Sequence, residues 1–554
     1  MDAYESQRSQ QDPNSLSLQN AGRFFPRLEA MSAFSPLRPN VVLIPLGELL
    51  GGVPYRLSEH SVELSPTTAI SGVTMASNDI EPGWIFVAVP GSRHGINFMD
   101  SAVQSGAVAV ITDDEGGAAA IGKDVPVIVV DDPRRVAADL SAIIYGPIHA
   151  ELPVVGITGT NGKTTTSYLT RAALGAPEKP VAIMGTVEVN TSKTSCYSTN
   201  TTQEVPVVQR ALAAAAEDGA TAAVVEVSSH GLELDRVAGI HFNVGVFLNL
   251  QHDHLDFHST MENYLAAKAR LFEPGRTDLG VICVDDKWGR QLAQSVQIPV
   301  QAVKAISTDD YEPEGLPLWK VDNIVVDAQA GGSRFTLVSP DGQRYEATCP
   351  MPGNANVQNA ALALVAAYNV GIPMDAAIAS LAAAPPVDGR SHWIQKPNPH
   401  GPAFQVDSAH TPEAVGYLLD AVRPLTAGNL IAVFGTDGDR DASKREDLAE
   451  VFAREADILY ITDENPRSEN ASDIRAQLLA GARRVRPDLK DVHEVRAGRT
   501  EAMRIALENA GPGDLVVVSG KGAERTQQWA DRSIPYYDPD VATQVLADVN
   551  SRRG

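Results

Sequence analysis

The sequence contains few cysteines, and they do not form a recognisable grouping. Three are present among 554 residues, Cys196, Cys283 and Cys349, and they lie far apart without a CxxC pair. This scarcity disfavours a disulfide framework and a structural zinc site, and it suits a protein that works in a reducing compartment. We therefore expect a cytoplasmic protein.

Basic residues are also in short supply. Lys and Arg number 45 against 69 Asp and Glu, which leaves a formal net charge of -24. General binders of nucleic acids or anionic membranes need a basic face, so the composition argues against both classes. A phosphorylated small-molecule substrate is still allowed, because a few local donors can hold it.

Long apolar segments are absent as well. No apolar run reaches the roughly 18 residues that a membrane-spanning helix needs, so no membrane insertion is expected. The first 20 residues are rich in Ser and Gln and lack the basic-then-apolar pattern of a secretory signal. We interpret residues 1–40 as a disordered N-terminal tail.

The rest of the chain alternates short apolar stretches with helical ones, a pattern typical of α/β folds. At roughly 150 residues per domain, the length predicts three or four domains. Apolar strands are predicted at 84–89, 108–112, 125–130, 152–157, 222–227, 244–249, 430–435, 458–463 and 515–520, with a helix at 99–106. Two prolines and a glycine within 382–389 predict a linker. We therefore expect domains at 41–150, 151–387 and 388–554. Ligands are expected at the polar turns that follow the last three strands.

A phosphate-binding loop is the strongest single motif. The segment GITGTNGKTTT at 156–166 follows a predicted strand and precedes a helix. Its glycines let backbone N–H groups face an anion, Lys163 can reach terminal phosphates, and Thr164 can offer a hydroxyl to Mg²⁺. Ile157 stands where a strict GxxxxGK[ST] pattern needs glycine, so the loop is a variant. A Gly/Thr-rich turn without a ligand is the alternative, and the Lys-Thr-Thr-Thr run argues against it.

Acidic and histidine residues follow two further predicted strands. Glu226 ends the first, and HDHLDFH at 252–258 follows the second. Carboxylate and imidazole groups beside a phosphate loop can hold Mg²⁺ together with ATP oxygens, whereas alone they also fit a zinc site or a solvated loop. Lys268 lies in an otherwise apolar helical stretch, and its spacing alone favours a surface lysine with a buried stem.

These motifs together resemble the Mur ligase family, ATP-dependent amide-bond synthetases of peptidoglycan assembly. The resemblance is carried in order by TGTNGKTT at 158–165, EVSSH at 226–230, NLQHDHLD at 249–256, AAKARLF at 266–272, NVQN at 356–359 and DSAHTP at 407–412. Within the family the chain is similar to the MurE branch, the UDP-N-acetylmuramoyl-tripeptide synthetases. That similarity is carried by GVTMAS at 72–77, Thr201-Thr202, GDRD at 438–441, ENPR at 464–467 and GKGAE at 520–524.

The resemblance implies an architecture and a reaction. It implies a UDP-sugar-binding first domain, a central phosphate-loop ATPase-like domain and a Rossmann-like C-terminal domain that binds the amino acid. The implied reaction adds a diamino acid to UDP-N-acetylmuramoyl-L-alanyl-D-glutamate through an acyl phosphate, with ATP and Mg²⁺. A monomer with small-molecule substrates, and without a nucleic-acid partner, is expected.

It also implies roles for individual residues. The nucleotide would contact Gly159, Thr160, Asn161, Gly162, Lys163, Thr164, Thr165, Asn356, Asn359 and Arg390. Magnesium would be served by Thr164, Glu226, His254 and a carbamylated Lys268, which replaces the surface interpretation of that lysine. Catalysis would use Lys163, Glu226, His254, Lys268, Asp407 and His410. The UDP-muramoyl dipeptide would contact Ser77, Ser92, Arg93, Thr201, Thr202, Ser228 and Arg236. The diamino acid would contact Arg440, Glu464, Asn465, Arg467, Gly520 and Glu524.

Departures from the family pattern gather in the third domain. The usual Asp-Asn-Pro-Arg begins here with Glu464, and the glycine-rich turn before GDRD carries Thr436-Asp437. The usual Asp-Tyr-Ala-His, Gly-Arg-Met-Glu and Gly-Lys-Gly-His-Glu read DSAH at 407–410, GRSH at 389–392 and GKGAE at 520–524. Arg467 can pair bidentately with a second carboxylate, which favours meso-diaminopimelate. L-lysine and L-ornithine are the alternatives.

Three other classes of protein compete with this interpretation. A folylpolyglutamate synthetase would lack the N-terminal uridine-nucleotide domain. A phosphate-loop NTPase that drives partner binding would leave Lys268 and the third domain without a role. A catalytically dead paralogue would not need to retain Lys163, Glu226, His254 and Lys268.

Overall fold

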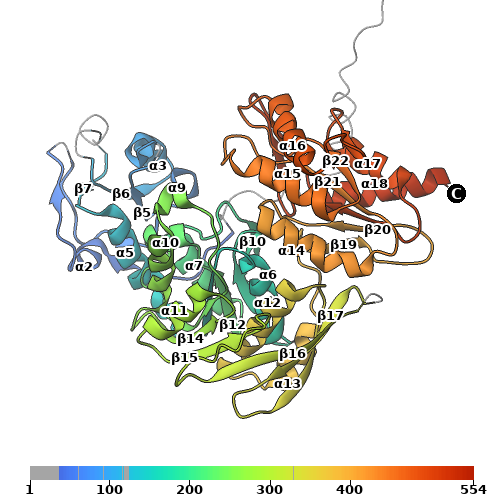
Figure 1. Cartoon of the computed structure of the whole chain (residues 1–554). Coiled ribbons are helices and arrows are strands. Elements are labelled where there is room, and N and C mark those ends of the chain that lie inside the picture. Colours follow the sequence, from blue (N-terminus) through green and yellow to red (C-terminus); the bar gives the residue numbers. More distant parts are fainter. Residues whose placement is uncertain are drawn as a thin grey trace, which may run out of the picture. The chain divides into compact units, whose positions relative to one another are not determined.

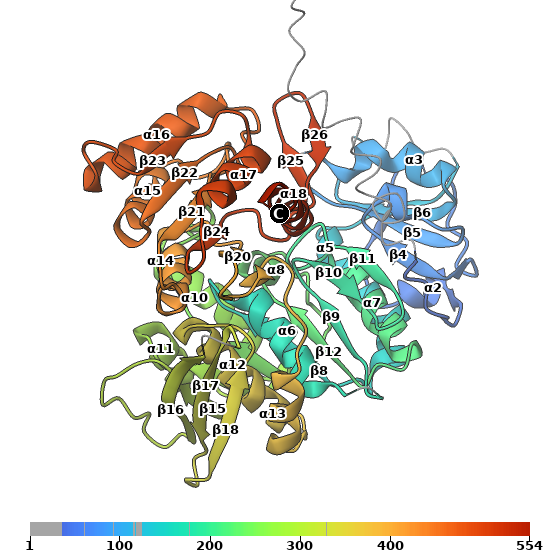
Figure 2. The same cartoon turned by 90° about the vertical axis from the view of Figure 1, so that its right-hand side faces the viewer.

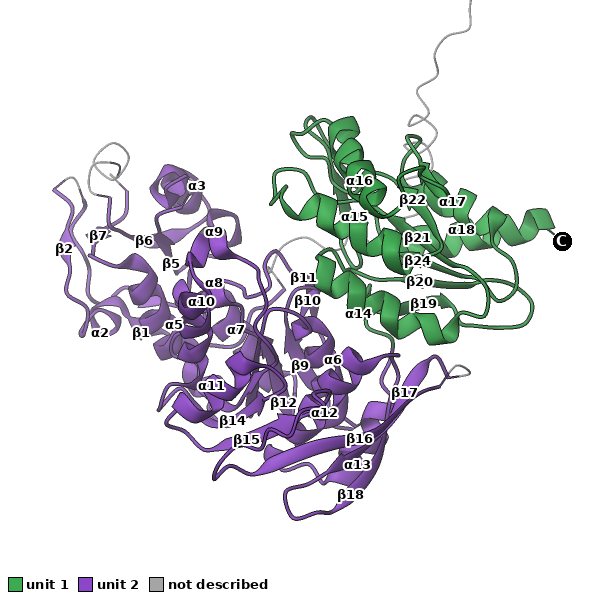
Figure 3. Ribbon diagram, in the orientation of Figure 1, with its two compact units in different colours: residues 1–32, 386–554 green, residues 33–385 purple. Residues whose placement is uncertain are grey.

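The computed structural model describes residues 36–553 except 60, 92, 115, 116, 118–123, 177, 328 and 329. The chain divides between Pro385 and Pro386 into two compact units, called here the N-terminal unit and the C-terminal unit (Figure 3). Residues 1–35 of the predicted tail and Ser92 lie outside the described residues. No helix of the described residues is long and apolar enough to cross a bilayer.

The N-terminal unit begins with a five-stranded sheet that is parallel except at one edge. Its order is β2 (Arg56–Leu57), β7 (Val127–Val129), β6 (Ala107–Thr112), β5 (Trp84–Ala88) and β4 (Gly72–Thr74), with β2 antiparallel. The helices of this region are α2 (Leu46–Leu49), α3 (Met99–Gln104) and α5 (Pro133–His149), and a short pair joins β1 (Ile44–Pro45) to β3 (Ala69–Ile70). The predicted strands at 84–89, 108–112 and 125–130 and the helix at 99–106 are confirmed within a few residues.

The same unit contains an eleven-stranded sheet, whose middle is parallel and carries the phosphate loop (Figure 1). Its order is β11 (Ser195–Tyr197), β10 (Glu188–Asn190), β9 (Val181–Met184), β12 (Ala222–Glu226), β8 (Val154–Thr158), β13 (Phe242–Phe247), β14 (Thr277–Cys283), β15 (Val300–Lys304), β16 (Leu318–Asp327), β17 (Gly332–Val338) and β18 (Arg344–Cys349). Its helices are α6 (Lys163–Leu174), α7 (Val205–Glu217), α8 (Ser229–Glu233), α9 (Leu255–His258), α10 (Met261–Ala269), α11 (Lys287–Ser295), α12 (Asn354–Asn369) and α13 (Met374–Ala382). In this order the strands from β9 to β16 run parallel to one another. Helices connect most of them, because parallel strands need crossover connections.

The two sheets of the N-terminal unit are joined by a shared apolar core. Helix α5 of the first region packs along α7 of the second. Val205 and Ala213 of α7 and Ala238 lie in the same buried cluster as the core of the five-stranded sheet. These two regions therefore form one compact unit although each has a sheet of its own.

The C-terminal unit is a six-stranded sheet between helices (Figure 2). The order is β19 (His392–Gln395), β20 (Ala403–Val406), β24 (Leu515–Val518), β21 (Leu430–Phe434), β22 (Ile458–Ile461) and β23 (Val492–Glu494), with only β19 antiparallel. Helices α14 (Pro412–Val422), α15 (Lys444–Glu455) and α16 (Ala471–Val485) pack together, and α17 (Arg499–Asn509) packs with α18 (Asp538–Arg553). A hairpin of β25 (Thr526–Gln528) and β26 (Ser533–Pro535) completes the unit. The predicted α/β class and the three strands predicted here are confirmed.

Candidate active site

The phosphate loop joins the carboxyl end of β8 to the start of α6 and is tied to the loop after β13. Thr160 N donates to Asn249 O at 3.0 Å, and Asn161 N donates to Asn249 Oδ1 at 3.0 Å. Gly162 has φ +90°, and a Cβ there would lie 2.6 Å from Asn359 Oδ1. Only glycine fits this backbone and this close approach without strain. These contacts therefore fix the conformation of the loop at the N-terminus of α6, a position that suits an anion.

Two lysine amino groups converge on one carbonyl oxygen of this loop. Gly159 O accepts from Lys163 Nζ at 3.0 Å and from Lys268 Nζ at 2.8 Å. Lys268 is 1% exposed, which contradicts the surface position that spacing alone favours. Burial and the neighbouring Lys163 lower the pKa of Lys268 well below its usual value. The result is a buried amine that loses its proton more readily than an ordinary lysine.

The carboxylate of Glu226 is buried at the end of β12, beside the start of α6. Its Oε2 accepts from Thr164 Oγ1 at 3.1 Å and from Thr186 Oγ1 at 3.0 Å, and its Oε1 accepts from Thr186 N at 3.0 Å. A hydroxyl and a carboxylate at this spacing are the protein ligands with which phosphate-loop enzymes hold Mg²⁺. The described residues contain no group of three or more His, Cys, Asp or Glu arranged to hold a metal by themselves. The donors present thus fit Mg²⁺ whose other ligands are nucleotide oxygens and water.

His254 lies within a group of aromatic rings at the start of α9. Its ring centroid is 5.0 Å from that of His230 and 6.1 Å from that of Tyr264. Partial burial, together with the neighbouring His230 and Lys163, lowers the pKa of His254 to about 4. The imidazole is therefore neutral at physiological pH, the state in which it can act as a metal ligand or accept a proton.

The predicted muramoyl-peptide residues Thr202, Ser228 and Arg236 lie together near Glu226. Thr202 Oγ1 lies 2.9 Å from Glu226 O and 3.0 Å from Ser228 Oγ, and Arg236 Nη1 donates to Thr202 O at 3.1 Å. Thr201 joins them through Thr186, whose Oγ1 lies 3.1 Å from Thr201 Oγ1. Because Thr186 also donates to Glu226, one chain of hydrogen bonds links these residues to Thr164 of the phosphate loop.

The remaining predicted residues of the N-terminal unit are not part of this hydrogen-bond chain. Asn359, in α12, accepts from Thr166 Oγ1 at 3.1 Å, and its Nδ2 lies 3.4 Å from Asn356 Oδ1, so both asparagines adjoin α6. Ser77 begins a single 3₁₀ turn, and Arg93 is exposed with its guanidinium 5.2 Å from the Phe98 ring centroid.

In the C-terminal unit, predicted residues follow the carboxyl ends of neighbouring strands. Asp407 follows β20, and its carboxylate accepts from Ser391 N at 2.6 Å and Ala409 N at 2.8 Å. Burial raises the pKa of Asp407 above its usual value. His410 Nδ1 donates to Ser408 O at 2.7 Å. The Arg390 side chain donates only to the neighbouring Gly389 O among the contacts of the described residues.

Arg467, Asn465 and Glu524 form one polar cluster with two residues that the sequence did not predict, Asp437 and Lys521. Asp437 accepts from Arg467 Nη2 at 2.8 Å and from Asn465 Nδ2 at 2.7 Å. Asn465 Nδ2 also donates to Glu524 Oε2 at 2.9 Å, and the buried Lys521 Nζ donates to the same oxygen at 2.8 Å. These five groups form one hydrogen-bond network at the carboxyl ends of β21, β22 and β24, in which Asn465 bridges an Arg–Asp pair and a Lys–Glu pair.

Glu464 and Gly520 lie beside this network, whereas Arg440 does not join it. Glu464 is 4% exposed, its Oε2 has no hydrogen-bond partner among the described residues, and a Cβ on Gly520 would overlap that oxygen. Burial, with nearby carboxylates, raises the pKa of Glu464 to about 8. Arg440 is exposed in the loop after β21.

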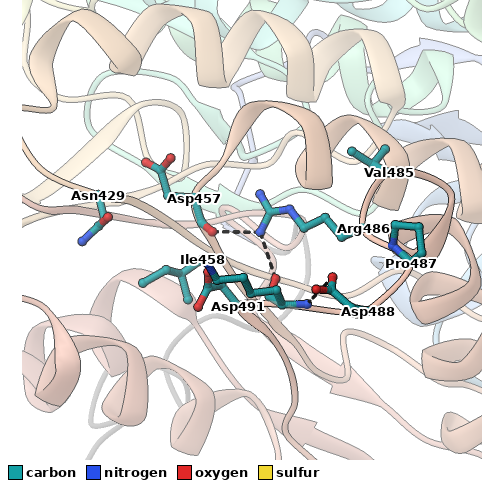
Figure 4. A pocket seen from close by; sticks show the side chains of 9 residues that line it. Asn429, Asp457, Ile458, Val485, Arg486, Pro487, Asp488 and Asp491 are labelled. Atoms are coloured by element: carbon teal, nitrogen blue, oxygen red, sulfur yellow. Dashed lines mark hydrogen bonds between the residues drawn. The ribbon is translucent and has the colours of Figure 1, made fainter.

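A hollow of about 550 Å³ in the C-terminal unit lies at the opposite edge of the sheet (Figure 4). It is lined by Asn429, Asp457 and Asp491, which precede β21, β22 and β23, and by Arg486, whose Nη1 donates to Asp457 O at 2.8 Å. None of the predicted site residues lines it. The predicted residues of the C-terminal unit lie instead at the carboxyl edge of the sheet, where ligands of open α/β sheets bind.

Several residues of the site escaped prediction from the sequence. Asn249 belongs to the NLQHDHLD motif and Asp437 directly precedes GDRD, so the sequence signal for each residue is a position inside a motif or beside one. Thr186 follows β9 with no motif around it, and only the sheet order brings it to Glu226.

Comparison with known proteins identifies the class of this fold and site. Residues 157–367 match the Mur ligase middle domain, residues 389–522 the Mur ligase glutamate ligase domain, and residues 69–145 the Mur ligase family catalytic domain. The chain therefore belongs to the Mur ligase family, with its three-domain α/β architecture, and is an ATP-dependent ligase that forms amide bonds.

Its relatives narrow the branch of the family. The chain is 38% identical over 513 residues to UDP-N-acetylmuramoyl-L-alanyl-D-glutamate--2,6-diaminopimelate ligase of Streptomyces coelicolor, covering 92% of this chain and 98% of the relative. It is 38% identical to UDP-N-acetylmuramyl-tripeptide synthetase of Leifsonia xyli, covering 94% and 98%. The predicted resemblance to the MurE branch is thereby confirmed.

Solved structures agree in fold. A structure of UDP-N-acetylmuramoyl-L-alanyl-D-glutamate--2,6-diaminopimelate ligase has a TM-score of 0.60 at 27% identity, covering 93% of this chain and 100% of the other. The MurF ligase of Thermotoga maritima, solved in complex with ADP, has a TM-score of 0.59 at 18% identity, covering 87% and 98%, and is similar in fold alone.

Proposed function

We propose that this ligase adds meso-diaminopimelate to UDP-N-acetylmuramoyl-L-alanyl-D-glutamate during peptidoglycan synthesis in the cytoplasm. The observation that carries the proposal is the joint approach of Lys163 and Lys268 to Gly159 O, next to the buried Thr164–Glu226 pair. Lys163 supplies a cation where a carboxylate must meet ATP, and the buried Lys268 amine lies beside the magnesium-type donor pair, where it can be carbamylated. The identity of the substrates is inferred from the names of the relatives.

The nucleotide is assigned to the phosphate loop. Lys163 Nζ would meet the γ-phosphate, and backbone N–H groups of the loop and the start of α6 would hold the other phosphates. The proposed nucleotide residues are Gly159, Thr160, Asn161, Gly162, Lys163, Thr164, Thr165, Asn356, Asn359 and Arg390.

Magnesium is assigned to Thr164, Glu226, His254 and a carbamylated Lys268. When bound, the ion offsets charge on the transferred phosphoryl group. The lowered pKa of Lys268 favours carbamylation, because its neutral amine attacks the carbon of CO₂ and releases a proton to leave an N-carboxylate. Carbon dioxide dependence is the test: ligase activity that is identical in CO₂-free and bicarbonate-containing buffer would contradict the carbamate.

The two other substrates are assigned to the remaining clusters. The UDP-muramoyl dipeptide is proposed to contact Ser77, Ser92, Arg93, Thr201, Thr202, Ser228 and Arg236. The amino acid is proposed to contact Arg440, Glu464, Asn465, Arg467, Gly520 and Glu524, with Arg467 pairing with the second carboxylate of diaminopimelate. L-lysine and L-ornithine lack that carboxylate and are the alternative substrates.

The chemistry has two steps. The D-glutamyl γ-carboxylate attacks the γ-phosphorus of ATP, which forms an acyl phosphate and releases ADP. The amine of the diamino acid then attacks the acyl carbon, and phosphate leaves from the tetrahedral intermediate. Lys163 offsets the repulsion between two anions in the first step. Asp407 and His410 are assigned to the second step, in which the attacking amine loses a proton.

Phosphate release tests the proposal directly. The enzyme is supplied with ATP, Mg²⁺ and the UDP-muramoyl dipeptide, and with meso-diaminopimelate, L-lysine or L-ornithine in parallel. We expect release and a tripeptide product with meso-diaminopimelate. Product from none of the three would refute the proposal, and product from lysine alone would refute the role of Arg467. ATP hydrolysis without dipeptide or amino acid would instead favour a phosphate-loop NTPase. Sedimentation is expected to show a monomer.

A further inference from the structure

The loop after β21 holds the carboxylate of Asp437 beside the residues proposed to bind the amino acid. Gly438 N donates to Asn465 O at 2.8 Å, and a Cβ on Gly438 would overlap Pro466 O. The backbones of the loops after β21 and β22 are thus in direct contact at this point. The preceding residue, Asp437, is held beside Arg467 by this contact and by its own carbonyl, which accepts from the buried Arg445 at 3.1 Å.

Arg467 is equally constrained. Its backbone has φ +52°, and its N–H donates to Gln528 O at 3.1 Å. Its Nη2 is 2.8 Å from Asp437 Oδ2, and both side chains are about one fifth exposed. Among the described residues, Nη2 donates to Asp437, Nε is buried without a partner, and no hydrogen bond engages Nη1. Nη1 is therefore left for a ligand.

The charges of the cluster are already paired. Arg467 faces Asp437 at 2.8 Å, and the buried Lys521 faces Glu524 at 2.8 Å. A second carboxylate arriving at Arg467 therefore shares its cation with Asp437 and lies close to a like charge. In a half-buried site such repulsion is only partly screened by solvent. A ligand that ends in an ammonium group meets no such penalty.

We propose that Asp437 is a specificity-determining residue: its carboxylate competes with the second carboxylate of diaminopimelate for Arg467. This competition lowers the ratio of kcat/KM for diaminopimelate to kcat/KM for L-lysine. This inference rests on the proposed pairing of Arg467 with that carboxylate. Diaminopimelate still binds, through the Nη1 edge, but with less discrimination than an unopposed arginine would supply.

The test compares two amino acids in one variant. kcat/KM is measured for meso-diaminopimelate and for L-lysine, with ATP and the UDP-muramoyl dipeptide saturating, in the wild type and in Asp437→Asn. The substitution removes the charge and keeps the shape. We expect the ratio of kcat/KM for diaminopimelate to that for lysine to rise about tenfold, because a charged hydrogen bond to Arg467 becomes fully available to the substrate.

Asp488→Asn is the matched control. Asp488 is an exposed carboxylate at the opposite edge of the same sheet, where it lines the hollow of Figure 4 and accepts from Lys490 N at 3.2 Å. The variant removes the same charge from the same unit but away from Arg467, so its ratio should equal that of the wild type. Asp437→Ser is a second variant in case Asp437→Asn does not fold, and it should shift the ratio in the same direction.

The outcomes separate the two proposals. A ratio that stays the same or falls in both Asp437 variants, in an enzyme that ligates diaminopimelate, overturns the role of Asp437 alone. An equal rise in Asp488→Asn also overturns it, because the effect would then reflect net charge. A wild type that ligates neither amino acid overturns the proposed function together with this inference.

Discussion

Glu464 is a carboxyl group that the C-terminal unit buries next to other carboxylates. It is 4% exposed, and Asp437 and Glu524 both act to keep it protonated. Burial is the larger cause, because a charged carboxylate loses its hydration there. The pKa of about 8 means that the folded protein carries a neutral Glu464 at physiological pH.

This residue predicts a pH dependence of stability. The unfolded chain ionises Glu464 near its usual pKa of about 4.3, whereas the folded chain holds the proton until about pH 8. The folded state therefore binds more protons between these values, and its stability falls as pH rises, by up to about 1.4 kcal/mol per pH unit. Glu464→Gln removes this dependence, so the variant should gain stability relative to the wild type as pH rises from about 5 to about 8.

Urea denaturation at several pH values measures the effect. Glu413→Gln, in the exposed first turn of α14, is the control and should differ from the wild type by at most about 1 kcal/mol at any pH. A constant difference between Glu464→Gln and the wild type across this range would show that Glu464 ionises in the folded protein as it does in the unfolded chain.

At the scale of the element, the turn between β8 and α6 depends on Gly162. Its φ is +90°, and Asn359 Oδ1 lies only 2.6 Å from the place that a Cβ would take, so there is no room for a side chain. Gly162→Ala should therefore displace Asn359 and distort the loop, at a cost of about 1–3 kcal/mol in stability. We expect the affinity for ADP to fall at least about tenfold, measured by calorimetric titration.

Gly146→Ala separates a local effect from a general one. Gly146 lies inside α5, outside the phosphate loop and directly before Pro147, and no atom other than its chain neighbours and the helix's own backbone lies within 4 Å of a Cβ position. The affinity of this variant for ADP should be that of the wild type. If Gly162→Ala binds ADP as tightly as the wild type does, the phosphate loop is not part of the nucleotide site.

At the scale of the whole molecule, one buried ionic cluster joins the two sheets of the N-terminal unit. Asp79 Oδ2 accepts from the fully buried Arg210 at 2.6 Å, and Asp79 Oδ1 accepts from Arg38 at 3.1 Å. Both guanidinium groups lie over the Trp84 indole, at 4.7 Å for Arg38 and 4.9 Å for Arg210. Arg210 belongs to α7, so it anchors the five-stranded region to the central one.

Asp79→Asn should loosen this junction. Removing one partner leaves a buried cation without its counter-ion, which costs about 3–5 kcal/mol. Glu81→Gln is the matched control, because Glu81 pairs with Arg38 at 3.2 Å but is about half exposed, and its loss should cost at most about 1 kcal/mol. Denaturation of both variants measures the difference. Equal stability losses would mean that the cluster does not hold the two regions together.

The sequence by itself determined the class of fold and the strands that carry the site, and its resemblance to the Mur ligase family supplied most residues of the two clusters. Apolar runs and glycine-rich turns are local signals, and the phosphate loop is a contiguous one. The sequence did not predict β16, nor the strands β17 and β18, which extend the sheet beyond its parallel middle through antiparallel pairs.

Only the tertiary structure decided which charges meet. Asp437 and Arg467 are separated by 30 residues, and Thr186 and Glu226 by 40, so neither pair is visible as a motif. The burial of Lys268 and of Glu464 is likewise set by what packs over them. A side chain's neighbours across a sheet depend on strand order and loop packing, and these are properties of the whole fold that no local stretch of sequence encodes.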